Sequence, residues 1–308
     1  MSLGNVSGKI IHQFVIGGFD TLDRPLTVGI VILCIYLLVM LSNVANICFI
    51  LHDKRLHKPM YLLICNLALV DMLYSSSACP TMIGVLVAGD KAIAYVSCFI
   101  QMFVFHLGGV MEMFAISVMA FDRLIAISNP LRYQSILTNV RTLVLTGALW
   151  LVACAFVAVM PATVLSLPYC HSTLKYTFCD YAALVRATCV NPILVLHVPF
   201  VFIVLSYVCI LLALFRITTW EGCVKALKTC TSHLLRVALF LLPFISTYIA
   251  AVTFSLHPNA RIICLSLASA IPLMLNPVIY VLNTEEIRTG KHKDRRQTVQ
   301  QQGTEQGN

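Results

Sequence analysis

Two carboxylic acids lie deep inside long apolar stretches of the sequence, where an ionisable group is costly. Asp71 follows Pro59, which starts one stretch, by 12 residues, and Glu112 precedes Asp122, which ends another, by 10. In bilayer-crossing helices these separations place the carboxyls about 18 Å and about 15 Å inside. No Lys or Arg occupies the middle of any stretch, so a proton or a bound cation must neutralise them. Oxygen ligands favour a hard ion, and we expect Na⁺ here.

An alternative for this pair needs no ion. Both carboxyls can be protonated and hydrogen-bonded within a structural network, since burial favours the neutral form of an acid. In either case Asn43, Ser117 and Asn276 are polar residues of apolar stretches that can supply further oxygens.

A second charged pair, Asp122-Arg123, stands at the end of the apolar stretch that begins near Cys98. The 24 residues from Cys98 to Asp122 make about 36 Å of helix, enough to connect the two faces of a bilayer. An arginine at such an end can extend its charge into water beside a helix-end carboxylate. From these residues alone, that interfacial role is the favoured interpretation.

Seven stretches have the length that a bilayer-crossing helix requires, about 20 mostly apolar residues. They cover residues 26–51, 59–88, 97–127, 140–165, 192–215, 237–256 and 262–282. Pro199, Pro243 and Pro277 interrupt the last three, and proline kinks a helix, which membrane spans tolerate. Since no other stretch is long enough to fold separately, we predict an all-α membrane protein with one seven-transmembrane-helix bundle.

The composition points to the same class of protein. Of the 308 residues, 59% are hydrophobic and 11% are charged, whereas soluble domains have about 45–50% apolar and about 25% charged residues. So little charge cannot cover the surface of a soluble fold, and such high hydropathy excludes a disordered or fibrous chain.

The basic residues indicate how the bundle is oriented. Fifteen Lys and Arg flank the spans on one side, with the C-terminus, and six flank them on the other. Because basic loops resist translocation, the N-terminus is expected outside and the C-terminus inside. The net charge of +8 is then a topology signal, and we expect no nucleic-acid partner.

Two further features agree with this orientation. Asn5 belongs to the only N-glycosylation sequon, Asn5-Val6-Ser7, in the segment expected outside. An even number of cysteines lies in or beside the expected outer loops, where the compartment is oxidising: Cys98, Cys170, Cys179 and Cys189. Four cysteines allow three pairings, and their spacing does not choose among them.

Several segments, in this order and at these span ends, resemble the rhodopsin-like (class A) G-protein-coupled receptors, and more narrowly the odorant receptors. They are residues 56–61 (LHKPMY), 119–128 (MAFDRLIAIS), 129–133 (NPLRY), 206–207 (SY), 225–234 (KALKTCTSHL) and 272–280 (PLMLNPVIY). The resemblance covers about residues 36–287. Leu124 replaces the usual tyrosine, and Ser42 replaces a common glycine. Residues 240–242 (FLL) replace the Phe-Tyr-Gly typical of mammalian odorant receptors, and Pro243 restores the proline of other rhodopsin-like receptors. These departures indicate a divergent branch, which we interpret as fish-like.

The resemblance implies roles that the residues alone left open. It implies disulfides Cys98–Cys179 and Cys170–Cys189, and a sodium-linked acidic pair formed by Asp71 and Glu112. The residues that it implies for activation and G-protein coupling are Asp122, Arg123, Tyr207, Asn276, Pro277 and Tyr280.

A ligand site between helices should be concave and mostly apolar, with a few converging polar groups. His106 lies eight residues from Cys98, about 12 Å from the outer end. Other candidates in the same helix region or at comparable depth are Phe105, Gly109, Val110, His197, Ser246, Tyr248, Ser266 and Ser269. The alternative for each His or Ser is a bond to a neighbouring helix. Phe105 stands where amine receptors carry an aspartate, so we expect no strong ammonium salt bridge at that position. Asp180, beside Cys179, can instead meet a polar ligand from the outer loop.

The resemblance implies an odorant receptor of the cell membrane. It would bind a small extracellular molecule in the outer half of the bundle and activate a heterotrimeric G protein of the stimulatory or olfactory type, raising cAMP. We expect no covalent cofactor and Na⁺ as an allosteric ion. The chain would comprise an extracellular segment (1–25), the seven-transmembrane receptor domain (26–283), and a short amphipathic helix with a disordered cytoplasmic tail (284–308).

Other classes of function fit less well. An ion-coupled transporter or channel could use Asp71 and Glu112 as an ion path, but the internal repeats common in transporters are absent from the sequence. A retinal pump lacks its lysine, since none lies between Arg261 and Asn283. The sequence has no metalloprotease, nucleophile-elbow or phosphate-loop motif, so we predict no enzyme.

Overall fold

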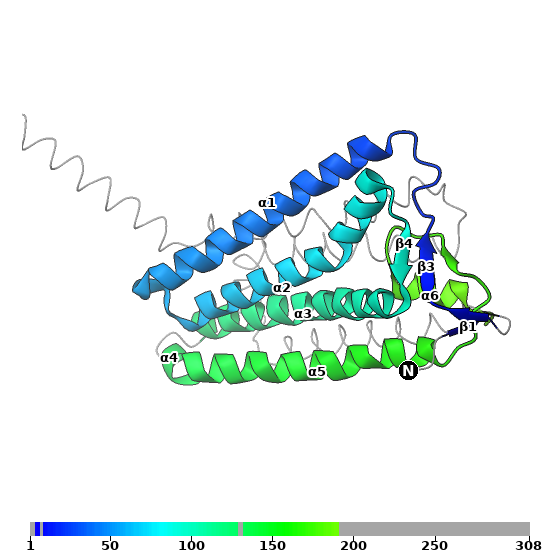
Figure 1. Cartoon of the computed structure of the whole chain (residues 1–308). Coiled ribbons are helices and arrows are strands. Elements are labelled where there is room, and N and C mark those ends of the chain that lie inside the picture. Colours follow the sequence, from blue (N-terminus) through cyan, green and yellow to red (C-terminus); the bar gives the residue numbers. More distant parts are fainter. Residues whose placement is uncertain (1–3, 7–8, 129–131, 191–308) are drawn as a thin grey trace, which may run out of the picture.

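The structure is a computed structural model of the whole chain and describes residues 4–6, 9–128 and 132–190. Four long helices dominate this part and lie alongside one another (Figure 1). They are α1 (Pro25–His52), α2 (Pro59–Ile83), α3 (Tyr95–Ser128) and α5 (Asn139–Leu165). A π-helical turn, η2 (Gly84–Ala88), continues α2. All four helices are long and apolar enough to cross a membrane, and they coincide with the first four predicted spans. The spans predicted at 192–215, 237–256 and 262–282 lie outside the described residues.

Local sequence signals explain where these helices begin. Pro25 and Pro59 occupy the first turns of α1 and α2, where a proline costs no hydrogen bond and its fixed φ suits a helix. Thr138 precedes α5, and its hydroxyl accepts a hydrogen bond from the amide of Arg141. That bond satisfies one of the amides that the first turn leaves without a helical partner.

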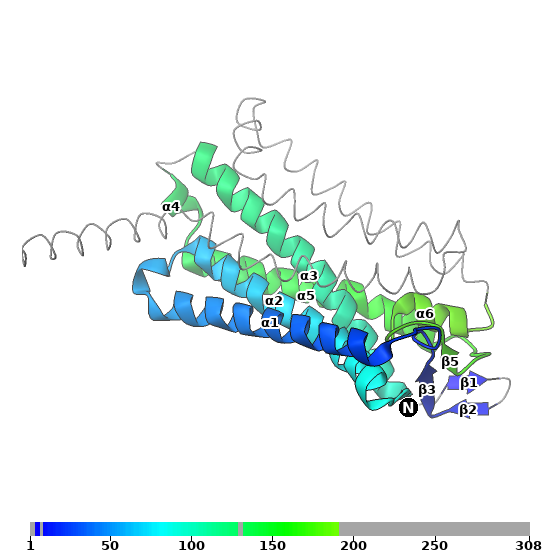
Figure 2. The same ribbon diagram turned by 90° about the horizontal axis from the view of Figure 1, so that it is seen from above.

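The short elements lie at the two ends of the four helices. One end carries the disulfides and is called the disulfide end here; its elements are β1 (Gly4–Val6), β2 (Lys9–Ile11), β3 (Gln13–Ile16), β4 (Ala92–Ala94), β5 (Thr173–Leu174) and α6 (Tyr181–Ala187). The opposite end, the α4 end, carries η1 (Lys54–Leu56) and α4 (Tyr133–Ile136). In the view of Figure 2, the strands gather beyond the helices and α3 is inclined to α1.

A small sheet joins three distant segments at the disulfide end. β3 is its central strand and pairs antiparallel with β4 and parallel with β5. Val15 stands opposite both Ala92 and Thr173, so the N-terminal segment bridges two loops. β1 and β2 form a separate antiparallel hairpin. The prediction of an all-α protein was therefore incomplete, because these strands pair residues that are far apart in the sequence.

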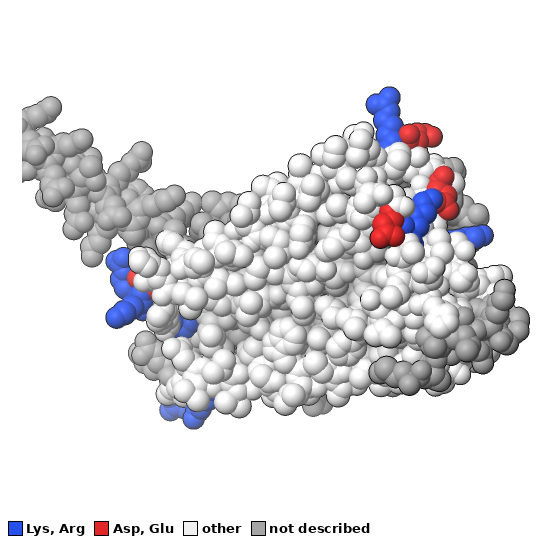
Figure 3. Space-filling view, viewed as in Figure 1, with Lys and Arg blue, Asp and Glu red and all other residues white. Residues whose placement is uncertain are grey.

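On the surface of the described part, charged side chains and exposed apolar side chains occupy different regions (Figure 3). In Figure 3 the Lys, Arg, Asp and Glu side chains gather at the two ends, and the band between them shows none on this face. α1 and α5 expose large apolar side chains along this band, such as Leu41 (67% exposed) and Leu151 (74%). Such a continuous apolar surface suits contact with lipid, as expected of membrane-crossing helices.

Close helix contacts depend on two glycines. A Cβ at Gly108 of α3 would lie 2.9 Å from Cβ of Tyr74, so α2 and α3 can approach only because this side chain is absent. A Cβ at Gly29 of α1 would lie 2.8 Å from a Val87 methyl carbon in η2. Small residues permit the same close approach in membrane helices generally.

Candidate functional site

The loop segment that begins at Cys179 is fastened to one face of α3. Cys98 of α3 forms a disulfide with Cys179. One turn further along α3, Oε1 of Gln101 accepts a hydrogen bond of 3.0 Å from the Cys179 amide. Nε2 of Gln101 donates to the Ser77 carbonyl at 2.6 Å and to Oγ1 of Thr81 at 2.7 Å, both on α2. The loop, α3 and α2 are thus joined around one buried amide side chain.

His106 and Asp180 meet just below this attachment. Nε2 of His106 lies 3.4 Å from Oδ1 of Asp180, and Nδ1 lies 2.8 Å from the Met102 carbonyl oxygen. A carbonyl oxygen only accepts, so Nδ1 carries the hydrogen of that bond. The side chains of His106 and Asp180 are 12% and 23% exposed, so both remain accessible. The structure therefore brings together two residues that the sequence predicted separately for ligand binding.

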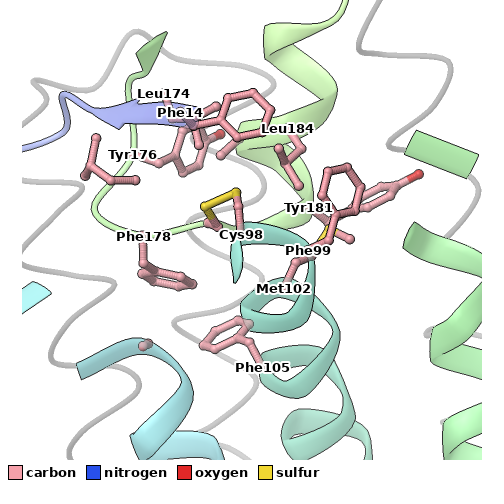
Figure 4. Close-up of a cluster of buried hydrophobic side chains, with 14 of the residues drawn as sticks. Phe14, Cys98, Phe99, Met102, Phe105, Leu174, Tyr176, Phe178, Tyr181 and Leu184 are labelled. Atoms are coloured by element: carbon pink, nitrogen blue, oxygen red, sulfur yellow. A yellow bond between two sulfur atoms is a disulfide. The ribbon is translucent and has the colours of Figure 1, made fainter. Parts of the chain in front are cut away.

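Aromatic side chains lie next to this pair, and Figure 4 shows three of them, Phe105, Phe178 and Tyr181, in the buried cluster around the Cys98 disulfide. The Phe105 ring lies 4.7 Å from Phe178 and 4.6 Å from Tyr74, and the His106 ring lies 6.3 Å from Tyr181. Tyr181 belongs to α6, and burial raises the pKa of its hydroxyl. The polar pair therefore lies against an apolar, aromatic surface, a composition typical of small-molecule sites.

The N-terminal strand covers the disulfide from the other side. Phe14 of β3 is fully buried, and its ring packs against Tyr95 and Tyr169. The Tyr169 hydroxyl donates a hydrogen bond of 3.1 Å to the Val164 carbonyl, and burial raises its pKa. Behind the strand, a Cβ on Gly18 would lie 2.3 Å from the carbonyl carbon of Tyr176, so only glycine fits. The N-terminal segment is therefore an integral part of this end.

The loop between α5 and the end of the described residues has a second covalent closure. Cys170 and Cys189 form a disulfide, and the Cys189 amide donates to the Pro168 carbonyl at 2.9 Å. The two pairings in the structure are those that the family resemblance implied. Asn5, the predicted glycan site, lies in β1 at this same end.

Asp71 and Glu112 are both fully buried, on α2 and α3. The nearby Ser75 hydroxyl donates to the Asp71 carbonyl at 2.7 Å, and Ser117 donates to the Met113 carbonyl at 2.8 Å. Asn43 is buried too. Two buried carboxylates suit a cation in charge and donor type, yet no three His, Cys, Asp or Glu side chains converge on a metal site within the described residues. The sodium site stays a prediction.

At the α4 end, Asp122 is buried and accepts a hydrogen bond of 2.6 Å from the Tyr133 hydroxyl of α4. The segment after α3 thereby returns to the helix end that carries the predicted coupling motif. Arg123 is part of the α3 backbone. At the same end, Asn139, the first residue of α5, donates a hydrogen bond of 3.0 Å to the His57 carbonyl. This bond ties the start of α5 to the connection between α1 and α2.

The remaining predicted ligand residues are placed only in part. Gly109 and Val110 are partly buried on α3, and Val110 packs in the cluster between α3 and α5. Several predicted residues lie outside the described part of the chain: His197, Tyr207, Ser246, Tyr248, Ser266, Ser269, Asn276, Pro277 and Tyr280.

Comparison with known proteins identifies the family. Residues 32–294 match the family model described as olfactory receptor. This chain belongs to the olfactory receptor family. Human olfactory receptor 1M1 is 35% identical over 274 residues, which cover 84% of this chain and 87% of that receptor. Human olfactory receptor 10G9 is 34% identical over 316 residues (96% and 98%), and mouse olfactory receptor 10D3 is 32% identical over 288 residues (90% and 90%).

Family membership establishes the class of this protein. Olfactory receptors are seven-helix membrane receptors that couple to G proteins and respond to small odorants, and they are not enzymes. The resemblance found in the sequence is thereby confirmed, and the transporter or channel interpretation loses its support. The four long apolar helices fit this class.

Two residues of this olfactory receptor that sequence reasoning missed are Gln101 and Tyr133. Gln101 occupies an apolar stretch one turn from Cys98, and a polar residue there signals an interhelical bond. Tyr133 ends the NPLRY segment, but its partner Asp122 is recognised only when α4 folds back.

Proposed function

We propose that this olfactory receptor binds a small odorant beside His106 and Asp180. The observation that supports this position is their 3.4 Å contact at partial exposure. Small-molecule sites combine an apolar wall with a few polar groups that orient the ligand, and Phe105, Phe178 and Tyr181 supply that wall. His197, Ser246, Tyr248, Ser266 and Ser269 are the further contacts expected from the later spans, with Gly109 and Val110 from α3.

A cell-based screen tests this position. Cells that express the receptor are exposed to amino acids, steroids and small volatile compounds while cAMP is recorded. For a compound that raises cAMP, His106→Leu should reduce its potency at least about tenfold if one bond to a charged or polar partner is lost. Cys154→Ala, on α5, is the matched control and should respond as the wild type does. Equal potency in His106→Leu and the wild type would contradict the proposed position.

The disulfide end is the extracellular one in this proposal. Disulfides form in oxidising compartments, and Asn5 of the sequon lies at the same end. The chain then consists of the extracellular segment 1–25, the receptor domain 26–283 and a cytoplasmic tail 284–308 that begins with a short amphipathic helix. The accessibility of an Asn5 glycan in intact cells tests this: the glycan should be removed by an externally added glycosidase and be absent from Asn5→Gln, whereas a glycan protected from the enzyme would contradict the orientation.

Signalling proceeds from the α4 end. The Tyr133 hydroxyl holds the Asp122 carboxylate, and Arg123 next to it is the residue that we expect to be released toward a G protein of the stimulatory or olfactory type. Tyr207, Asn276, Pro277 and Tyr280 are its expected partners in the later spans. The ligand and the G protein must both prefer the same active arrangement, so each strengthens the binding of the other.

Basal cAMP tests this step without any ligand. Arg123→Ala should reduce cAMP to the level of untransfected cells while surface expression persists. The control is Arg55→Ala, an exposed arginine of the same end whose partner is Asp53, and it should leave basal cAMP unchanged. Undiminished signalling from a correctly inserted Arg123→Ala receptor would overturn the role.

Asp71 and Glu112 would hold Na⁺ in the inactive receptor. The ion would replace the missing positive charge beside two fully buried carboxyls. Replacing K⁺ by Na⁺ should raise the melting temperature of the purified receptor, and Asp71→Asn should abolish that response. Asp53→Asn, a control at the α4 end whose carboxylate is partly exposed, should keep this response. A sodium response that survives in Asp71→Asn would refute this site. No sodium response in the wild type would favour the alternative of two protonated, hydrogen-bonded carboxyls.

A further inference from the structure

One ring nitrogen of His106, Nδ1, is already engaged in a hydrogen bond within α3. Nδ1 donates to the Met102 carbonyl at 2.8 Å within α3, so a hydrogen stays on that atom in both charge states of the ring. Nε2 then carries a hydrogen only when the ring is an imidazolium. In the neutral ring, Nε2 is an acceptor that faces the acceptor Oδ1 of Asp180 across 3.4 Å. The neutral pair therefore lacks a donor between its two atoms.

The Asp180 carboxylate faces His106 and does not cap the first turn of α6. It occupies the cap position before α6, yet its side chain makes no capping hydrogen bond. Aspartate at this position ordinarily accepts from the first-turn amides. The Asp180 carbonyl does accept from the Leu184 amide at 3.1 Å, so the backbone keeps the helical bond while the carboxylate points elsewhere. The carboxylate is directed toward His106 instead.

The residues before and after Asp180 are both held in place. The preceding residue, Cys179, is held by its disulfide to Cys98 and by its amide bond to Gln101. The following residue, Tyr181, is buried, and its hydroxyl lies 3.4 Å from Oγ1 of Thr163 on α5. These contacts hold the main chain on both sides of Asp180, so the acceptor pair is preorganised at the level of the backbone.

We propose that this acceptor pair binds the ammonium group of an amine odorant that carries an aromatic ring. The proposal deepens the function proposed above and rests on it. An ammonium nitrogen has hydrogens for both atoms, and their separation of 3.4 Å allows one nitrogen to lie about 2.9 Å from each. It also matches the charge of Asp180, and the aromatic surface beside the pair suits both a cation and a ring.

Other ligand chemistries fit the pair less well. A carboxylate would have to lie beside the like charge of Asp180, and it could bond only to an imidazolium that Asp180 already neutralises. A neutral alcohol supplies one hydrogen for two acceptors. The matched series benzylamine, benzyl alcohol and benzoate therefore distinguishes the three classes at nearly constant size.

The test is binding to the purified, full-length receptor, read as apparent affinity from the shift of its melting temperature with concentration. Benzylamine should bind at least about tenfold more tightly than benzyl alcohol or benzoate, the margin of one charge-assisted bond. Asp180→Asn should remove this preference, whereas Asp180→Glu should keep the order of the three probes. Asp20→Asn is the matched control, because Asp20 pairs with Lys91 elsewhere at the disulfide end. Each variant is compared with its own ligand-free melting temperature.

Several results would overturn the proposal. They are no binding of benzylamine to the wild type, equal affinity for the three probes, tighter binding of benzoate, or an unchanged preference in Asp180→Asn. The wild-type result suffices if Asp180→Asn does not fold. Basal cAMP and its loss in Arg123→Ala are measured in parallel without ligand. If coupling persists while the amine preference is absent, only the ligand class is wrong; if coupling is absent as well, the proposed function fails.

Discussion

The backbone amide of Cys179 donates a hydrogen bond to Oε1 of Gln101 across 3.0 Å. Gln101 lies one turn from Cys98, the disulfide partner of Cys179, so a covalent bond and a hydrogen bond hold the same loop residue. The other end of the glutamine amide donates to the Ser77 carbonyl of α2. A side chain in this position aligns the loop with two helices at once.

Replacing Gln101 should therefore destabilise the disulfide end. In Gln101→Leu the buried Cys179 amide loses its acceptor and the Ser77 carbonyl loses a donor. We expect the free energy of unfolding to fall by about 2 kcal/mol or more, since each unsatisfied buried group costs about 1–3 kcal/mol. The measurement is thermal or denaturant unfolding in one detergent. Gln13→Leu changes an exposed glutamine and should alter the free energy of unfolding little. Equal decreases of this free energy in the two variants would contradict the bridging role of Gln101.

Gly108 and Gly147 make a second matched pair. Both are helical, but a Cβ at Gly108 would press on Tyr74 at 2.9 Å, whereas a Cβ at Gly147 would meet nothing within 4 Å. Gly108→Ala should destabilise the receptor by about 1–3 kcal/mol through overpacking. Gly147→Ala should be neutral or slightly stabilising, because alanine favours a helix. Melting temperatures of the two variants check this; a stable Gly108→Ala would show that α2 and α3 can separate at no cost.

The two disulfides should differ in their contribution to stability. The Cys98–Cys179 bond joins residues 81 positions apart, and the Cys170–Cys189 bond joins residues 19 apart. In the chain-entropy model, the larger loop gives about 4–5 kcal/mol and the smaller about 3 kcal/mol. Cys98→Ser should therefore lower the free energy of unfolding more than Cys170→Ser does. The reverse order, measured under identical conditions, would indicate that packing of the small loop dominates.

Alkaline pH should weaken the disulfide end through Tyr169. Burial raises the pKa of the Tyr169 hydroxyl, whereas the same hydroxyl ionises near pH 10 in an unfolded chain. Above about pH 10 the unfolded state loses a proton that the folded state retains, so the free energy of unfolding falls as pH rises. Tyr169→Phe removes this group.

The comparison of unfolding curves from about pH 8 to about pH 11 isolates this effect. Tyr169→Phe should be less stable than the wild type at the lower pH, because the bond to the Val164 carbonyl is lost. Its stability should then decline less steeply as the pH rises. Parallel declines in the two proteins would contradict the role of Tyr169.

The spans could be predicted from the sequence because their signal is local. The predicted stretches 26–51 and 140–165 end within one residue of α1 (Pro25–His52) and α5 (Asn139–Leu165). Hydropathy and the charges at each end define such a helix without any knowledge of its neighbours. The burial of Asp71 and Glu112 follows from the same pattern.

The features that the sequence did not reveal all depend on distant partners. β3 pairs with residues 92–94 and 173–174. The hydrophobic periodicity within a short segment does not predict a pairing with residues so far away in the sequence. The sequence singled out Gly109 as a candidate ligand contact, whereas Gly108, one position earlier, is the glycine against which Tyr74 packs closely. One residue turns a helix by about 100°, so the face that a glycine serves is decided by how the neighbouring helix packs.

The central position of β3 has a consequence for the order of synthesis. The strand leaves the ribosome first, but its partner β5 follows only after α1, α2, α3 and α5 have been made. Phe14 gains Tyr95 as a packing partner only when α3 begins, and Tyr169 only after α5 has been made. β3 is therefore made before the four long helices but completes its sheet only after them, so its docking reports that these helices and the loop that carries β5 have already been made.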